Sequence, residues 1–571
     1  MAPSVVTATD RPIPGSPGEP TAAALSGVRP ALDGVPTSGD ATATDATIDH
    51  QGRARARDVP KVTVSGLLRG IHPVLFGVYP VLFLWSQNVN EVGPADVSDV
   101  LGATFLFAGL VMLLAWLAFQ DRARGALFIT PAILAFLLYG HVERLGADAI
   151  HERAAIVALL AIALVLALKL PDRWITRVDT GLRFLAIALV VVTLWNILPT
   201  QVAEATTPRS IVADGKALPT STNAKKRDVY WLIFDRYGSD RSLQLEYKTK
   251  NDLTPWLKDH GFDVLADSHA NYVGTAQSLA TTSNMTPLAE LTKAVPANAA
   301  TYQPIYNTLQ GSLAVRQFQA LGYRYLHLGS WWNPTRFDKA ADRNFNADGV
   351  SDFTSAVVES SIVPVLSKAF IPDELPPTEP AKHLKHNTYA LDKLDALPLE
   401  GGPKFVWAHI LLPHPPYIFD ADGNYIESPK AAGISDTQAW RGQLAYTNKR
   451  IEGFIEELLS KPVDQQPIII LQADEGPWPA PYAKDKVNFD WSKATADQLE
   501  EKFGIMNAWY VPGGTEGLGL RQDQTAINTF PVLFDKYFGL DYPTLPDEVF
   551  ASSWWKIYQP LDVTDKLPSL K

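Results

Sequence analysis

Five long apolar runs, separated by short polar loops, occupy the first third of the chain. They cover residues 67–85, 100–119, 126–140, 154–170 and 182–198. About 20 apolar residues in a helix cross the hydrocarbon core of a bilayer, and the third run lies at the short end of that range. The pattern predicts a domain of five transmembrane helices over residues 61–200.

The loops between these runs differ in charge, and this difference predicts how the chain crosses the membrane. Lys and Arg concentrate before the first run and in the second and fourth loops, whereas the first loop is acidic and the third is mixed. Because basic residues favour the cytoplasmic side, we expect the amino terminus in the cytoplasm of a bacterial cell. After five spans, everything beyond about residue 199 is expected outside the plasma membrane. The basic residues are Arg53, Arg55, Arg57, Lys61, Arg69, Arg122, Arg124, Arg173, Arg177 and Arg183.

Two polar segments flank the apolar third of the chain. Residues 1–60 are rich in Ala, Pro, Thr, Ser, Gly and Asp, which predicts a disordered cytoplasmic tail. Residues 201–226 read as a linker to an outer domain over 227–571. The net charge of −11 argues against nucleic acid as a partner, and the lack of cysteine excludes disulfides and thiolate metal sites.

The outer domain alternates short apolar runs with amphipathic stretches. Strands are expected at 229–234, 323–328, 405–411, 468–471 and 508–511, and a helix over 446–459 has apolar residues at helical spacing. This alternation predicts a doubly wound α/β domain with a mainly parallel sheet.

Two of the expected strands end in carboxylates. The stretch DVYWLIFDRYG places Asp235 after one apolar run, and PIIILQADEGPW places Asp474 and Glu475 after another. Ligands gather at the carboxyl ends of parallel strands, so these three acids are expected to share a pocket. Crowded carboxylates need a cation or a proton to hold them together. The alternative is that each acid only caps a strand or lies in a solvated turn.

A hydroxyl-rich stretch, NYVGTAQSLATTSNMTP, begins at residue 271. Thr275 follows a glycine and stands at an expected helix start, where backbone N–H groups attract phosphate. A hydroxyl beside a metal ion ionises more easily and becomes a nucleophile. Thr275 is therefore a candidate nucleophile, with Ser278 in reserve; the alternative is that Thr275 merely starts a helix.

Histidine, tryptophan and arginine follow two further expected strands. YRYLHLGSWWNPTR carries one group of them, and FVWAHILLPHPPYIF carries two histidines, of which His414 stands between prolines and His409 lies within the strand. Arg and His can hold a phosphate, and a Trp face can pack on a sugar or glycerol. His409 is open to a second interpretation as a core residue. The candidate substrate-binding residues are His327, Trp332, Arg336 and His409, with His414 as a phosphate ligand or an acid/base.

The order of these motifs resembles that of the alkaline phosphatase and sulfatase superfamily. Five spans followed by an outer domain look like lipoteichoic acid synthases and, more loosely, phosphoethanolamine transferases. The resemblance implies one divalent metal ion, Mn²⁺ or Mg²⁺, and a phospho-threonine intermediate on Thr275. Glu475 stands where that family has His, Pro334 stands where it has Arg, and the Cys/Ser-x-Pro-x-Arg signature of sulfatases is missing. The implied metal ligands are Asp235, Thr275, Asp474 and Glu475.

Together these features predict a membrane-anchored phosphotransferase. It would move a phospho-head group, such as phosphoglycerol or phosphoethanolamine, from a membrane lipid donor to an envelope glycan or polymer. Two alternatives remain open at this point. One is a phosphatase- or sulfatase-like hydrolase with the same site, and the other is a non-catalytic protein that binds envelope glycans.

Overall fold

The computed structural model describes residues 68–143, 149–206, 217–218, 224–347, 349–371 and 378–570. The predicted tail over 1–60 lies outside these residues, as does most of the predicted linker. The first part of that linker, residues 201–206, is the end of a long helix.

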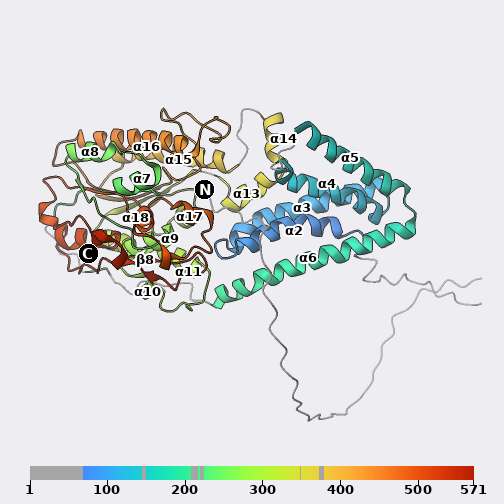
Figure 1. The fold of residues 1–571 in the computed structure, drawn as a ribbon, viewed down its shortest axis with the longest axis horizontal. Coiled ribbons are helices and arrows are strands. Elements are labelled where there is room, and N and C mark those ends of the chain that lie inside the picture. Colours follow the sequence, from blue (N-terminus) through green and yellow to red (C-terminus); the bar gives the residue numbers. More distant parts are fainter. Residues whose placement is uncertain are drawn as a thin grey trace, which may run out of the picture. The chain divides into compact units, whose positions relative to one another are not determined.

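Each of the five apolar runs forms a helix in the part of the chain that the structure describes. Helix α2 packs against three others, and α4 also contacts α3 and α5 (Figure 1). Three helices contain segments long and apolar enough to cross a membrane: Pro94–Phe119, Arg122–His141 and Asp172–Val202. Five spans and their orientation stay predictions. The helices are α2 (His72–Gln87), α3 (Pro94–Phe119), α4 (Arg122–Glu143), α5 (Ala149–Lys169) and α6 (Asp172–Thr206).

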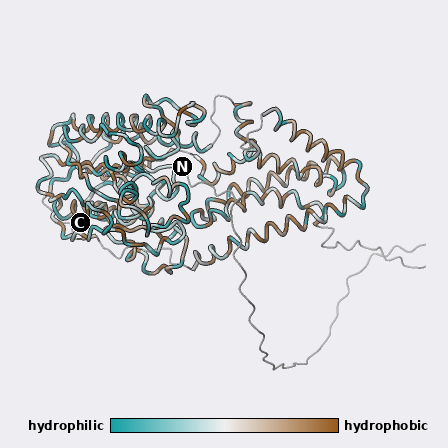
Figure 2. The backbone as a smooth tube through the Cα atoms, in the orientation of Figure 1, coloured by the Kyte–Doolittle hydropathy of each residue, from teal (hydrophilic) through white to brown (hydrophobic). Residues whose placement is uncertain are grey.

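Apolar side chains cover the outside of this helical bundle. Leu106, Phe184 and Trp195 are all at least 70% exposed, and Figure 2 shows hydrophobic residues following the helices along their length. Such a surface is unfavourable in water and suits lipid. The bundle therefore fits a membrane anchor.

The outer domain is built on a seven-stranded mixed sheet in the order β2-β7-β6-β1-β5-β3-β4. From β6 to β4 all neighbours are parallel, whereas β7 is antiparallel to both β6 and β2. All five predicted strands are present, and β1 has the predicted bounds. The strands are β1 (Val229–Phe234), β2 (Asp263–Val264), β3 (Arg324–Leu328), β4 (Arg343–Phe345), β5 (Lys404–Ile410), β6 (Ile468–Gln472) and β7 (Asn507–Tyr510).

Helices cover both faces of this sheet. Alternate residues of β1 point to opposite sides: Trp231 packs in the core under α9, and Leu232 packs in the core under α15 and α16 (Figure 1). A strand that is buried on both faces reads as a continuous apolar run, which is why β1 could be predicted closely. The remaining helices of the domain are α7 (Asp240–Tyr247), α8 (Leu253–Asp259), α9 (Thr275–Asn284), α10 (Leu288–Leu291), α11 (Gln303–Leu309), α12 (Leu313–Ala320), α13 (Asp352–Ser360), α14 (Val363–Phe370), α15 (Glu379–Ala396), α16 (Asp436–Leu459), α17 (Ala480–Lys484), α18 (Ala496–Phe503) and α19 (Thr529–Val532), and a hairpin of β8 (Phe550–Ala551) and β9 (Leu561–Asp562) lies near the end of the chain.

Helix α16 starts ten residues before the helix predicted over 446–459. Its first turn is closed by a capping box, in which Ser435 Oγ accepts from the Gln438 backbone N–H at 3.2 Å and Gln438 Oε1 accepts from the Ser435 N–H at 2.9 Å. This reciprocal pair satisfies two otherwise unpaired donors of the helix start. The added residues carry the buried Trp440 and Leu444 onto the sheet.

The loop between α2 and α3 reaches the outer domain. Trp554 Nε1 donates to Glu91 Oε1 at 2.7 Å, and the Tyr302 backbone N–H donates to the Asn90 carbonyl at 2.9 Å. In the first turn of α3, Asp96 Oδ1 accepts from Asn333 Nδ2 at 2.6 Å. A segment between two apolar helices thus forms part of the surroundings of the site.

Candidate active site

Two tight turns at the carboxyl ends of β1 and β6 lie against each other. Gly238 closes the turn after β1, and a Cβ there would come within 2.7 Å of Pro477 Cδ in the turn after β6. Only glycine permits this approach. The two turns therefore bring Asp235 and Asp474 together from positions 239 residues apart in the chain.

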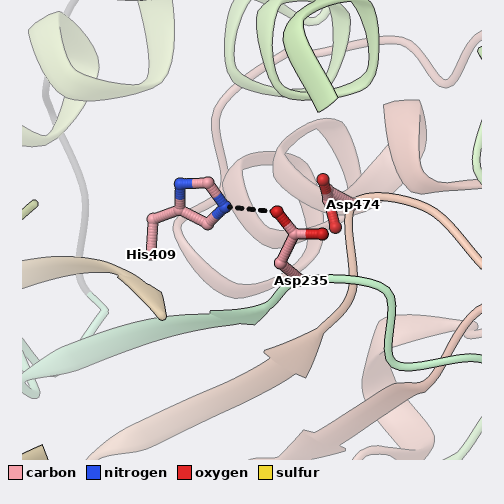
Figure 3. Close-up of side chains that lie close together, drawn as sticks. All are labelled: Asp235, His409 and Asp474. Carbon is pink, nitrogen blue, oxygen red and sulfur yellow. Dashed lines mark ion pairs between the residues drawn. The ribbon is translucent and has the colours of Figure 1, made fainter. Parts of the chain in front are cut away.

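Asp235, His409 and Asp474 form one buried group. The ligand atoms that they offer all lie within 4.8 Å of one another, and His409 Nε2 lies 3.6 Å from Asp235 Oδ2 (Figure 3). Residue His409 is on β5 beside Ile233 of β1, so the parallel register places its ring next to the residue that follows β1. The sequence had offered His409 as a substrate-binding candidate or as a core residue.

Each member of this group has a buried polar atom without a hydrogen-bond partner. These atoms are Asp235 Oδ1, His409 Nε2 and Asp474 Oδ2. Burial raises the pKa of Asp474 well above its usual range, and the carboxylates of Asp235 and Glu475 raise it further. Two carboxylate oxygens and one imidazole nitrogen are the ligands that Zn²⁺ and Mn²⁺ accept in proteins. The residues thus fit one divalent ion.

A hydroxyl chain holds the ring of His409. Thr335 Oγ1 lies 2.8 Å from His409 Nδ1 and 2.8 Å from Ser330 Oγ. If His409 Nδ1–H donates to Thr335, Nε2 keeps its lone pair toward the aspartates. Partners of this kind fix the tautomer and orientation of metal-binding histidines.

Thr275 begins α9 beside this group. It follows Gly274, which is the extended N-cap residue, and its side chain opposes the burial that raises the pKa of Asp474. The reserve candidate Ser278 is buried one turn further on, where its hydroxyl donates to the Tyr272 carbonyl at 3.1 Å. Of the two hydroxyls, the one of Thr275 lines the pocket.

Glu475 lies outside the Asp235–His409–Asp474 group. Its Oε1 accepts from Arg236 Nε at 2.7 Å and from Trp478 Nε1 at 2.9 Å, and its Oε2 accepts from Lys502 Nζ at 2.7 Å. Burial alone would raise the pKa of Glu475, but the charges of Lys502 and Arg236 outweigh it and hold this pKa below its usual value. The structure thus gathers His409, and not Glu475, with the two aspartates.

A pocket of about 780 Å³ opens above these residues. Its wall includes Asp235, Arg236 and Thr275 from the sheet end, Asn88 and Glu91 from the loop between α2 and α3, and Asp96 from the first turn of α3. Of the predicted substrate-binding residues, Trp332 and Arg336 line it, and His414 does as well. The Trp332 ring lies 6.3 Å from the His409 ring at 81°.

His327 lies away from this pocket wall. Its Nδ1 is 2.9 Å from Tyr325 Oη and its Nε2 is 2.9 Å from the Thr335 carbonyl, so both ring nitrogens have partners in the core. His327 therefore supports Thr335, which in turn contacts His409.

His414 has a distinct environment. Its Nδ1 contacts the Pro415 carbonyl, and burial lowers the pKa of its imidazole well below the usual value, with the charge of Arg236 adding to the effect. In the neutral ring, Nδ1–H donates to Pro415 and Nε2 is left as an acceptor. This arrangement favours proton transfer over phosphate binding among the two roles considered for His414.

Comparisons with known proteins yield similarity only to solved structures. No family model matches the chain, and no curated protein matches it. Solved structures similar to it include the periplasmic domain of EptC from Escherichia coli (12% identity, 62% of this chain and 98% of that chain, TM-score 0.38). Another is the integral membrane protein EptA, a lipooligosaccharide phosphoethanolamine transferase from Neisseria meningitidis (11% identity, 82% of this chain and 95% of that chain, TM-score 0.37). A third is a 2-O GAG sulfatase (12% identity, 58% of this chain and 73% of that chain, TM-score 0.34). At these scores the geometry of the site carries the functional inference.

Proposed function

We propose that this protein is a membrane-anchored, metal-dependent phosphotransferase. It moves a phospho-head group from a lipid donor to a hydroxyl of an envelope glycan or polymer, on the outer side of the plasma membrane. The carrying observation is the set of three unpaired buried atoms on Asp235, His409 and Asp474, next to a hydroxyl at a helix start.

Asp235, His409 and Asp474 would hold the divalent ion. When bound, it would lower the pKa of the Thr275 hydroxyl and offset negative charge on the phosphoryl oxygens. Because His409 adds a nitrogen donor, the ligand set admits Zn²⁺ as well as the predicted Mn²⁺ or Mg²⁺.

The chain's own residues account for both half-reactions. In the first, Thr275 Oγ1 attacks phosphorus, so that an O–P bond forms as the P–O bond to the lipid breaks. His414 Nε2 accepts the hydroxyl proton and passes it to the leaving lipid oxygen. In the second, the acceptor hydroxyl gives its proton to His414 Nε2 and attacks the same phosphorus, the bond from phosphorus to Thr275 Oγ1 breaks, and His414 returns the proton to Thr275. The first amide groups of α9 would donate to the transferred group, as helix starts do with phosphate.

The pocket wall supports a lipid donor. Glu91 comes from the loop before α3 and Asp96 from the first turn of α3, a helix that exposes apolar side chains, and both residues line the pocket that contains Thr275. A head group near the bilayer surface would therefore reach the nucleophile while its tails stay in lipid.

Mass spectrometry of the full chain in detergent tests this proposal. Incubated with membrane lipid extract and Mn²⁺ or Zn²⁺, the protein should gain a phospho-head group on Thr275, and chelation should prevent it. Thr275→Ala should abolish the adduct, Thr275→Ser should retain part of it, and Ser278→Ala serves as the matched control. An adduct that survives Thr275→Ala would refute the assignment, and turnover with water but no acceptor would identify a hydrolase.

A further inference from the structure

Arg236 occupies a backbone conformation that arginine rarely adopts. Its φ is +58°, in the left-handed region, which costs a residue with a side chain about 1 kcal/mol. Two contacts offset this cost: the Arg236 backbone N–H donates to Asp474 Oδ1 at 3.2 Å, and its Nε donates to Glu475 Oε1 at 2.7 Å. The turn thus fixes the side chain directly beside the candidate metal group.

Only part of the Arg236 guanidinium is used by the protein. Within the part of the chain that the structure describes, its hydrogen bonds come from Nε and the backbone, and no bond from Nη1 or Nη2 is found. The side chain is 12% exposed, lines the pocket with Asp235 and Thr275, and stacks 3.7 Å over the Trp478 ring. Its forked end is therefore held in place and still has donors to give.

Because of Lys502, the positive charge of Arg236 is not neutralised by Glu475. It is completely buried, and its Nζ donates to Glu475 Oε2 at 2.7 Å. Gly476 makes this contact possible, since a Cβ there would come within 2.4 Å of the Glu501 carbonyl oxygen. Lys502 alone balances the charge of Glu475, so the cluster of Arg236, Glu475 and Lys502 carries one net positive charge toward the pocket.

We propose that Arg236 is the anion-binding residue of this pocket and that Glu475 positions it. The Nη groups of Arg236 would hold two oxygens of a tetrahedral anion, such as the phosphoryl group presented to Thr275, and Glu475 would be no metal ligand. The inference rests on the proposed function for the identity of the anion. One divalent ion balances Asp235 and Asp474, so the net positive charge that faces the anion comes from Arg236.

Binding of inorganic phosphate to the metal-loaded full chain in detergent tests this inference without turnover. Arg236→Gln should weaken phosphate affinity roughly 10–100-fold, as expected for lost charge-assisted hydrogen bonds, with metal content per chain unchanged. Arg236→Lys keeps the positive charge but loses the two-pronged guanidinium, so its phosphate affinity should lie between those of the parent and of Arg236→Gln. Arg343→Gln, on the edge strand where Arg343 pairs with Glu400, is the matched control and should bind as the parent does.

Glu475→Gln separates a positioning residue from a ligand. We expect metal content to stay the same while phosphate affinity falls several-fold, because the amide no longer holds the guanidinium by charge. Loss of metal from Glu475→Gln, or parental phosphate affinity in Arg236→Gln, would overturn the inference. If Arg236→Gln does not fold, Arg236→Lys with parental phosphate affinity would overturn it equally.

Transfer assays show which proposal fails. Phosphate binding that depends on Arg236 in a protein that never labels Thr275 would leave the anion site standing and remove the transferase. Unimpaired labelling of Thr275 in Arg236→Gln would remove only the role of Arg236.

Discussion

Two charged clusters lie side by side at the end of the sheet, and they differ in one respect. Asp235, His409 and Asp474 leave three buried atoms without partners, whereas Glu475 receives three hydrogen bonds from Arg236, Trp478 and Lys502. The two clusters alternate along the chain, since Asp235 precedes Arg236 and Asp474 precedes Glu475.

The contrast separates what the fold satisfies from what it leaves for a ligand. Burying an unpaired charge is costly, and the chain avoids this cost at Glu475 with its own cations. Among the residues that the structure describes, the one arginine or lysine that pairs with either aspartate is Arg236, whose Nε lies 4.0 Å from Asp235 Oδ1. The unsatisfied cluster is therefore the one that the proposed ion would occupy.

Asp474→Asn should give the largest effect. It removes one carboxylate ligand and the repulsion between the two aspartates, so we expect loss of the bound ion and a roughly 10³-fold fall in transfer. The metal-free protein should be no less stable than the metal-free parent, because like charges no longer crowd. Elemental analysis and thermal unfolding in detergent measure both. Asp464→Asn, at an exposed position before β6, is the control.

Lys502→Met should lower the stability of the protein without changing its metal content. It leaves Glu475 buried with one cation, and breaking such a buried pair costs up to about 3 kcal/mol. The unfolding temperature of the full chain should fall, with one ion per chain retained. The exposed Lys493→Met should change little. Loss of metal in Lys502→Met would show that the two clusters are not separable.

Thr335→Val tests the support of His409. The substitution keeps the shape but removes the hydroxyl 2.8 Å from His409 Nδ1, and loss of such a partner weakens metal binding roughly 10–100-fold. Thr335→Ser should restore most of the affinity. Competition with a chelator reports the change, and equal affinity in the Val variant would contradict the proposed orientation of the ring.

Trp478→Phe should give the smallest effect. It removes the Nε1–H that donates to Glu475 but keeps an aromatic face under Arg236. We expect a loss of about 1 kcal/mol in unfolding free energy, measured by thermal unfolding, with metal affinity untouched. A change in metal content in Trp478→Phe would show that metal binding depends on the cluster around Glu475.

Elements that depend on local pattern could be predicted from the sequence. The run VYWLIF is apolar on both faces of the sheet, and β1 has the expected bounds. Asp235, Thr275 and Asp474 were chosen because they follow strands or begin a helix, and the parallel sheet brings these ends together.

The grouping of His409, and not Glu475, with the two aspartates could not be read from local pattern. Glu475 turns away because Lys502, on α18, and Arg236, after β1, offer it charges from distant parts of the chain. His409 joins the aspartates because β5 lies next to β1 in a parallel register. Such facts follow from strand order, which one sequence does not reveal. Arg236 is part of the motif DVYWLIFDRYG, but the sequence did not single it out. The feature that distinguishes it is its left-handed backbone conformation, which only the structure shows.

The contribution of the α2–α3 loop to the pocket has a kinetic consequence. A donor lipid in the same leaflet would find Thr275 by lateral diffusion in two dimensions, so its mole fraction in the surface, and not its bulk concentration, would set the rate of encounter. Diluting the donor with inert lipid or detergent should slow transfer even when its total amount is constant. For a water-soluble acceptor, the rate would depend on its bulk concentration. The rate would therefore depend on surface mole fraction for the donor and on bulk concentration for the acceptor.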